Sequence, residues 1–210
     1  MAAVAVIGAA CFLSLPTIRA FAAQRAGEPQ VARRLILFVC GGNTSRSPMA
    51  AAIARSELAA FNGNGSGNGD GNGSGNGSVR WEIDSAGISV REPDAPIASE
   101  AVAALLDLGV DVPLDHRSKQ LTPGMCVDID MVYCMTREQR DSVIAIAPGA
   151  AERTVCLDPA EEDVLDPAGQ PMADAYRTCA ARLRTLVRGR LQEQRERYAV
   201  PAEAELAEGA

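Results

Sequence analysis

The chain has 210 residues, 47% of them hydrophobic, which suffices for one α/β domain with a buried core and additional segments at its ends. Its net charge of −7 argues against nucleic acid as a partner, because a duplex binder needs clustered positive charge. A single histidine, His116, excludes a multi-histidine metal centre. The six cysteines include no C-x-x-C pair, so the sequence indicates neither a zinc site nor a disulfide framework. Neither a metal nor a cofactor is therefore expected.

The first 33 residues are expected to lie outside the folded domain. Residues 1–15 are an uncharged apolar run, and Ala20-Phe21-Ala22 is similar to a signal-peptide cleavage site. However, no Lys or Arg precedes the run, and it is short for a membrane span. A disordered extension or an overlong start is therefore favoured over a signal or anchor. The expected location is the cytoplasm, where thiols stay reduced.

The first predicted elements are a strand and a helix. Residues 35–39 are apolar and largely β-branched or aromatic, which predicts a central strand with both faces buried. Ser47 followed by Pro48 predicts a helix N-terminus with Ser47 as the capping residue, and an alanine-rich run continues the helix. Arg55 and Glu57 of this helix are expected to face solvent.

The rest of the chain alternates predicted strands and helices. Residues 62–78, in which glycine alternates with Asn, Ser and Asp, predict a flexible surface insertion inside one domain. Further strands are predicted at 79–87, 130–135 and 153–157, and further helices at 96–108, 137–147 and 172–198. This alternation predicts a doubly wound parallel sheet of four strands with helices on both faces. The domain is expected to span 34–198, followed by a disordered acidic tail at 199–210.

Residues capable of chemistry concentrate directly after the first strand, in Cys40-Gly41-Gly42-Asn43-Thr44-Ser45-Arg46. A loop at a helix N-terminus directs backbone N–H groups and the helix dipole at an anion. A cysteine in that position is a candidate nucleophile, and Arg46 can hold phosphate oxygens with its planar guanidinium. The alternative is a buried structural cysteine beside a solvated arginine. The sequence favours a phosphate-binding loop formed by the backbone from Gly41 to Arg46.

With Ser47-Pro48-Met49-Ala50, this loop resembles that of the low-molecular-weight protein tyrosine phosphatases, C-x-G-N-x-[CS]-R-S-P-M-A. Two further segments are similar to the family, Trp81-Glu82-Ile83-Asp84-Ser85-Ala86 and His116-Arg117-Ser118-Lys119-Gln120-Leu121-Thr122. The resemblance covers about residues 34–198 and implies a flavodoxin-like fold. It also implies hydrolysis of phosphorylated protein substrates through a phosphocysteine intermediate, without a metal or cofactor. A monomer that does not associate with membranes is expected.

The resemblance further implies roles for residues outside the loop. The family carries its general acid in Asp-Pro-x-Gly ahead of the last helix, which Asp166-Pro167-Ala168-Gly169 matches, whereas Asp158-Pro159 lacks the glycine. Ser47 is placed to donate its hydroxyl to the Cys40 sulfur. Three residues match the family positions that brace the cysteine loop: Asn43, Ser85 and His116.

Four positions distinguish the chain from tyrosine-specific members. Ser45 stands where many members have a second cysteine, so no vicinal disulfide can form. Gly41 and Ala168 stand where those members have a leucine and an aromatic residue that contact a phenyl ring. Thr44 resembles the bacterial branch that acts on phosphoarginine, because a hydroxyl can position a polar guanidinium and its attacking water. Phosphotyrosine and phosphoarginine both remain candidate substrates.

Two other functions are compatible with such a loop. A thioredoxin-coupled arsenate reductase would need relay cysteines, for which Cys134 has a suitable place while Cys156 lies a strand away. A non-catalytic phosphate-binding module would be expected to lack the cysteine, arginine or aspartate, and all three are present. A phosphatase is therefore the favoured function.

Overall fold

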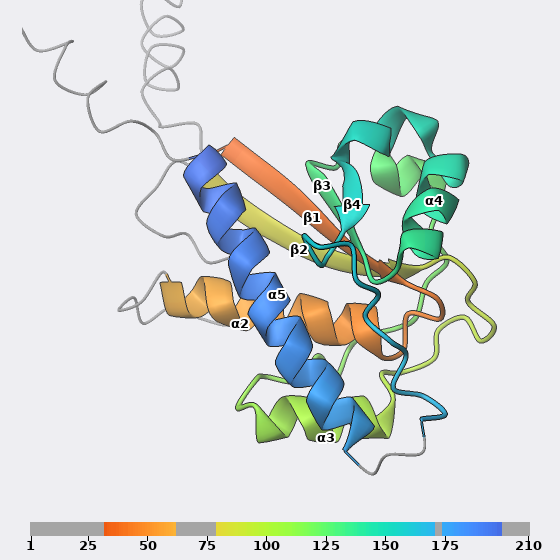
Figure 1. Ribbon diagram of the computed structural model, residues 1–210, viewed down its shortest axis with the longest axis vertical. Coiled ribbons are helices and arrows are strands. Elements are labelled where there is room, and N and C mark those ends of the chain that lie inside the picture. The colour runs from red at the N-terminus through yellow and green to blue at the C-terminus, as the bar shows by residue number, and fades with distance from the viewer. Residues whose placement is uncertain (1–31, 62–78, 171–173, 199–210) are drawn as a thin grey trace, which may run out of the picture. The chain divides into compact units, whose positions relative to one another are not determined.

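The computed structural model describes residues 32–61, 79–170 and 174–198. Its strands form one parallel sheet in the order β2-β1-β3-β4 (Figure 1). They are β1 (Ala32–Cys40), β2 (Val79–Gly87), β3 (Met131–Cys134) and β4 (Thr154–Cys156). The predicted flavodoxin-like doubly wound sheet is therefore confirmed, and the first strand lies at its centre.

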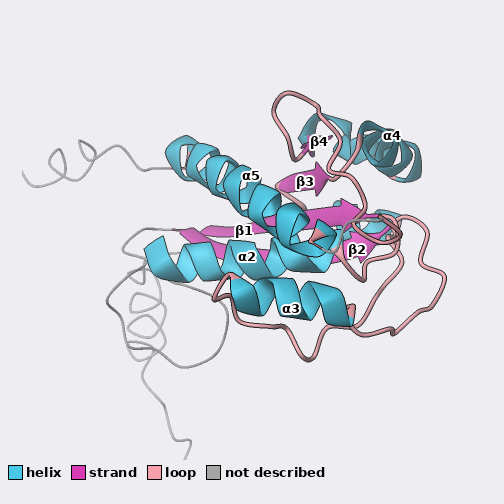
Figure 2. Ribbon diagram, turned by 60° about the horizontal axis from the view of Figure 1, so that its bottom comes forward, coloured by secondary structure: helices cyan, strands magenta, loops and turns pink. Residues whose placement is uncertain are grey.

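Helices cover both faces of the sheet, as Figure 2 shows. They are α2 (Arg46–Phe61), α3 (Ser99–Asp107), α4 (Arg137–Ile146) and α5 (Ala175–Arg197), with short 3-10 helices η1 (Pro123–Cys126) and η2 (Pro148–Arg153). Alternate residues of β1 enter two separate cores: Ile36 and Phe38 pack with α2, α3 and α5, and Leu37 and Val39 pack with α4 and the 3-10 helices. Both faces of a parallel strand are buried, which explains its uninterrupted apolar sequence.

The predicted element boundaries differ from the structure by up to three residues, at strand ends as well as at helix ends. The strand predicted at 79–87 has those bounds, whereas the strand predicted at 35–39 extends from Ala32 to Cys40. The helix predicted at 96–108 begins only at Ser99. The insertion at 62–78, the tail at 199–210 and residues 1–31 of the predicted extension lie outside the described residues. Within the described part of the chain, no helix combines the length and the apolar character that crossing a bilayer requires.

Helix α2 corrects two predictions made from its sequence. It begins at Arg46, so Ser47 is its second residue and not its cap, and the Ser45 carbonyl accepts the first helical hydrogen bond from Met49 N at 3.1 Å. Glu57 is buried and not solvent-facing, because Arg184 and Arg188 of α5 bind its carboxylate at 2.9 and 2.7 Å. α2 lies between the sheet and α5, so almost its whole surface is covered (Figures 1 and 2).

Arg55, the other residue of α2 that was expected to face solvent, is half-buried. Its Nη2 donates to the Ile83 carbonyl of β2 at 2.7 Å. Burial accordingly lowers the pKa of its guanidinium from the ordinary value. The alanine-rich helix thus contacts its neighbours with its polar residues as well as with its small ones.

Candidate active site

Cys40 is the last residue of β1, and the loop that follows it leads into the N-terminus of α2. Its side chain is buried, and its Sγ lies 3.0 Å from Ser47 Oγ. The backbone N–H of Asn43 donates to the same sulfur at 3.3 Å. Two groups able to donate hydrogen bonds therefore face the sulfur, which suits a sulfur that carries negative charge during a reaction.

Asn43 ties this loop to three other segments. Its φ is 57°, a left-handed conformation that Asn adopts more readily than most residues with a side chain, and it is fully buried. Its Nδ2 donates to Ser47 Oγ and to Ser85 Oγ, both at 3.0 Å, while its Oδ1 accepts from Lys119 N at 2.9 Å. The structure therefore brings together Ser47, Asn43 and Ser85, as the resemblance implied.

His116 joins the same network through the backbone of the loop. Its Nε2 lies 2.8 Å from the Asn43 carbonyl oxygen, which can only accept, so Nε2 carries the proton. Burial lowers the pKa of this imidazole below its usual value, and the positive charges of Lys119 and Arg55 lower it further. His116 thus donates a hydrogen bond to the backbone of the loop.

Arg46 and Asp166 lie side by side although 120 residues separate them in the chain. Arg46 is 6% exposed, and its Nη1 donates to the Val164 carbonyl at 3.0 Å while its Nη2 lies 2.5 Å from Asp166 Oδ2. Its Nε is buried and has no hydrogen-bond partner among the described residues. An unpaired guanidinium N–H at the phosphate loop fits one oxygen of a bound phosphate.

Asp158, the other candidate acid, occupies a structural position. Its Oδ2 binds Arg182 Nη2 at 2.9 Å, and its Oδ1 accepts from Ala160 N at 2.8 Å. These two hydrogen bonds, led by the one from Arg182, hold the pKa of the Asp158 carboxyl below its usual range. The Asp166 carboxylate also binds an arginine, but that arginine, Arg46, belongs to the cysteine loop, and the Asp166 side chain is 49% exposed. The position of Asp166 beside the loop therefore favours it over Asp158 as the proton donor.

Gly87, which the sequence did not single out, lies where three backbone segments meet. After it, Ile88 N donates to the Cys40 carbonyl at 3.0 Å, and Leu121 N donates to the carbonyl of Gly87 at 2.7 Å. A Cβ at this position would lie 2.6 Å from the Gly41 oxygen and 3.0 Å from Asn43 N. The position therefore needs glycine because the loop backbone approaches too closely for any side chain. Its place directly after Asp-Ser-Ala was the only sequence signal.

The three positions linked to substrate choice lie in or beside the loop. A Cβ at Gly41 would meet no heavy atom within 4 Å, so open space surrounds this residue. Thr44 is partly exposed, and its carbonyl accepts from Ala98 N at 2.9 Å. Ala168 is exposed, and its N–H donates to Asp166 Oδ1 at 3.1 Å. The turn that contains Ala168 thus orients the Asp166 carboxylate. Gly41 and Ala168 both leave the space beside them uncovered.

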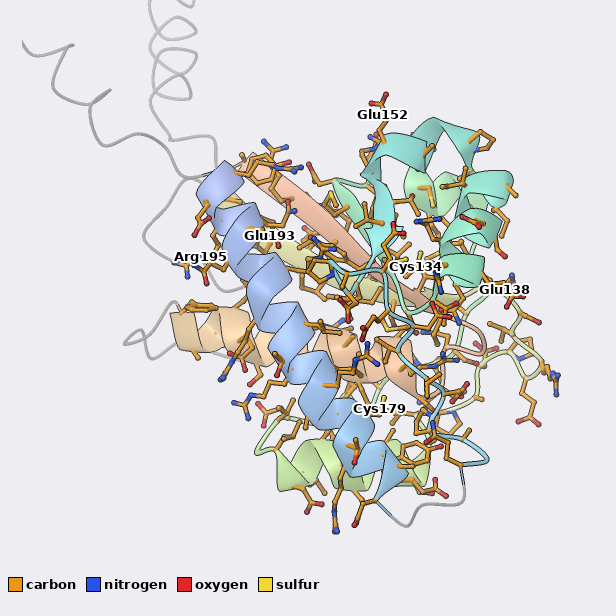
Figure 3. The ribbon with its side chains drawn as sticks, viewed as in Figure 1. Cys134, Glu138, Glu152, Cys179, Glu193 and Arg195 are labelled. Atoms are coloured by element: carbon orange, nitrogen blue, oxygen red, sulfur yellow. The ribbon has the colours of Figure 1, made fainter. Side chains whose placement is uncertain are left out.

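The cysteines apart from Cys40 show no sign of reactivity. All five cysteines in the described ranges, Cys40 included, are free and buried. Cys134 packs in the core that includes Val143 of α4, whereas Cys40 belongs to the core on the other face of the sheet, and burial raises the pKa of the Cys134 thiol. Burial also raises the pKa of Cys179, which lies on α5 (Figure 3), to about 11. Across residues 32–61, 79–170 and 174–198, no three His, Cys, Asp or Glu side chains converge to hold a metal.

A family model described as low molecular weight phosphotyrosine protein phosphatase matches residues 35–199. The chain belongs to this family. Among curated relatives, a protein-arginine-phosphatase of Geobacillus stearothermophilus is 30% identical over 156 residues, covering 72% of this chain and 90% of that protein. The solved low molecular weight protein tyrosine phosphatase from T. tengcongensis has a TM-score of 0.63 at 30% identity, covering 76% of this chain and 99% of its own. The YwlE arginine phosphatase from Geobacillus stearothermophilus has a TM-score of 0.62 at 27% identity, covering 80% and 99%.

Family membership establishes the class of reaction. The protein is a cysteine-dependent protein phosphatase and thus a phosphoric monoester hydrolase, as its loop predicted. The arsenate reductase alternative is not favoured, because Cys134 is buried and faces away from Cys40. The non-catalytic alternative is not favoured either, because Cys40, Arg46 and Asp166 are all present around one loop.

Proposed function

We propose that this phosphatase removes phosphate from arginine residues of proteins. The observation that carries the proposal is Thr44, a partly exposed hydroxyl residue in the same loop as Gly41, which has no side chain. A hydroxyl can hydrogen-bond a guanidinium and its attacking water, and the missing side chains remove the apolar contacts that a phenyl ring prefers. The relative named protein-arginine-phosphatase supports the same substrate.

Phosphotyrosine is the second candidate substrate. The solved relative from T. tengcongensis, 30% identical, is named a protein tyrosine phosphatase. A curated relative from Ralstonia nicotianae, 27% identical over 135 residues, is named a probable low molecular weight protein-tyrosine-phosphatase. The two substrates differ in the bond that breaks, which is P–N for phosphoarginine and P–O for phosphotyrosine.

In the proposed first step, the Cys40 thiolate attacks phosphorus and the bond to the leaving group breaks. Backbone N–H groups from Gly41 to Arg46 and the Arg46 guanidinium bind the equatorial oxygens. Asp166 gives its proton to the departing nitrogen or oxygen, so that no negative charge remains on that atom when the amino-acid side chain leaves. The products are a phosphocysteine and an ionised Asp166.

In the proposed second step, a water molecule attacks the phosphorus of phosphocysteine. Asp166 accepts a proton from that water, the S–P bond breaks, and inorganic phosphate leaves with the Cys40 thiolate restored. Asn43, Ser47, Ser85 and His116 act indirectly, by holding the loop around the sulfur. We propose that the enzyme works as a monomer in the cytoplasm, where its free thiols stay reduced.

The substrate proposal is tested by comparing kcat/KM on phosphoarginine and phosphotyrosine peptides of one sequence. The ratio should favour phosphoarginine in the wild type and fall about 10-fold or more in Thr44→Ile, because the hydroxyl is lost. Thr44→Ser is the matched control, since it keeps the hydroxyl and should keep the preference. A wild type that prefers phosphotyrosine, with Thr44→Ile leaving the ratio unchanged, would refute the arginine assignment. Cys40→Ser should abolish turnover of both peptides.

A further inference from the structure

The segment between β4 and Asp166 runs without helix or strand and is shaped by a tight turn. The Asp158 carbonyl accepts from Glu161 N at 3.0 Å, and Glu161 has a left-handed φ of 58°. A glutamate in this conformation costs on the order of 1 kcal/mol, so surrounding contacts must hold the turn in place. The segment needs such contacts because it delivers Asp166 to Arg46.

Arg182 of α5 is half-buried and binds the segment both at the start of this turn and just beyond its end. Its Nη2 binds Asp158 Oδ2 at 2.9 Å, and its Nη1 donates to the Asp163 carbonyl at 2.9 Å. Nη2 also lies 3.4 Å from the Glu162 carbonyl and 3.6 Å from its Oε2. The side chain of Asp158 is only 12% exposed, so this ion pair is shielded from water on one side.

The contact at Asp163 continues directly to the phosphate loop. The Asp163 carbonyl and the Val164 N–H form one peptide group. The carbonyl is bound by Arg182, and the N–H donates to the Met135 carbonyl at 2.8 Å. The carbonyl of Val164 in turn accepts from Arg46 Nη1 at 3.0 Å, two residues before Asp166. Arg182 and Arg46 therefore hold neighbouring peptide groups of one short segment, and Arg182 restrains it from the side of α5.

We propose that Arg182 is a positioning residue for the phosphatase reaction: it holds residues 158–163 so that Asp166 meets the leaving group. The proposal rests on the function proposed above, in which Asp166 is the acid. Besides Arg46, three other arginines contact the segment. Arg140 and Arg137 are paired with exposed side chains, Arg140 with Glu161 at 2.6 Å and Arg137 with Asp163 at 3.9 Å, and Arg190 binds only the start of the segment, at the Leu157 carbonyl at 2.9 Å. Arg182 binds the backbone as well as a shielded carboxylate, so it restrains the chain itself.

The test uses two substrates whose leaving groups differ in how much they need a proton. Phenyl phosphate needs a positioned acid more than 4-nitrophenyl phosphate does, and kcat/KM reports the step in which the leaving group departs. Arg182→Met keeps a long unbranched side chain but removes the hydrogen-bond donors of the guanidinium. In this variant, kcat/KM should fall about 10-fold more on phenyl phosphate than on 4-nitrophenyl phosphate. Inhibition by inorganic phosphate should not change, because the loop around Cys40 is untouched.

Three further variants make the result interpretable. Arg188→Met removes another α5 arginine that forms an ion pair, with Glu57 of α2, and should leave the ratio of the two substrates as in wild type. Asp166→Asn should change the ratio most. Arg182→Lys should lie between wild type and Arg182→Met, since one ammonium cannot reach both Asp158 and the Asp163 carbonyl in the same fork geometry.

The possible outcomes separate the two proposals. If Asp166→Asn changes the ratio but Arg182→Met slows both substrates equally, the role of Arg182 is wrong while the proposed function stands. If Asp166→Asn leaves the ratio unchanged, the acid assignment in the proposed function is wrong. Should Arg182→Met fail to fold, Asp158→Asn, which removes the charged partner instead, must shift the ratio in the same direction for the proposal to hold.

Discussion

Replacing Asn43 by alanine should destabilise the protein more than most single substitutions do. The buried side chain forms three hydrogen bonds: to Ser47 Oγ at 3.0 Å, to Ser85 Oγ at 3.0 Å and from Lys119 N at 2.9 Å. Each contributes about 1 kcal/mol net, and alanine at a φ of 57° costs about 1 kcal/mol more. The expected decrease in the free energy of unfolding is therefore about 4 kcal/mol.

Urea denaturation followed by circular dichroism measures this decrease, and Asn43→Gly separates its two causes. Glycine loses the same hydrogen bonds without the conformational strain, so it should be about 1 kcal/mol more stable than Asn43→Ala. Both variants should also lower kcat on 4-nitrophenyl phosphate, because Asn43 N donates to the Cys40 sulfur. A decrease below about 1 kcal/mol for Asn43→Ala, or no advantage of glycine, would show that this residue does not hold the loop.

Three further predictions concern residues around the loop. Because burial holds the pKa of folded His116 below its usual value of 6.5, the unfolded state binds the proton first as the pH falls through 6.5. Wild type should therefore lose more unfolding free energy than His116→Gln between pH 7.5 and 5.5, and equal losses would contradict this. Gly87→Ala should lower the free energy of unfolding by about 1–3 kcal/mol in urea denaturation and should lower kcat, because its Cβ would push the Gly41 oxygen. Wild-type values of both would mean that the loop backbone moves aside without cost. Glu57→Gln should cost about 2 kcal/mol by the same assay, and a neutral effect would mean that its two arginine contacts contribute nothing.

The parts of the site that sequence reasoning predicted are those that one continuous segment contains. An apolar strand, a glycine loop and a helix start follow one another within residues 35–50, so Cys40 and Arg46 are brought to one loop by local geometry alone. The bounds of β2 were also predicted, since its alternation is visible in the sequence. The roles proposed for Ser85, His116 and Asp166 required the resemblance to a family, because no local pattern links these residues to Cys40.

The sequence by itself determined the fold class and the loop that carries Cys40 and Arg46, because strand and helix periodicity and a short loop depend on neighbours in the chain. Only the tertiary structure decided that Ser47 does not cap α2, that Glu57 is buried, and that Gly87 admits no side chain. An alanine-rich helix has no polar stripe that reveals its covered faces. The partners of Glu57 lie 127 and 131 residues away, and such contacts exist only once the sheet has brought α5 across α2.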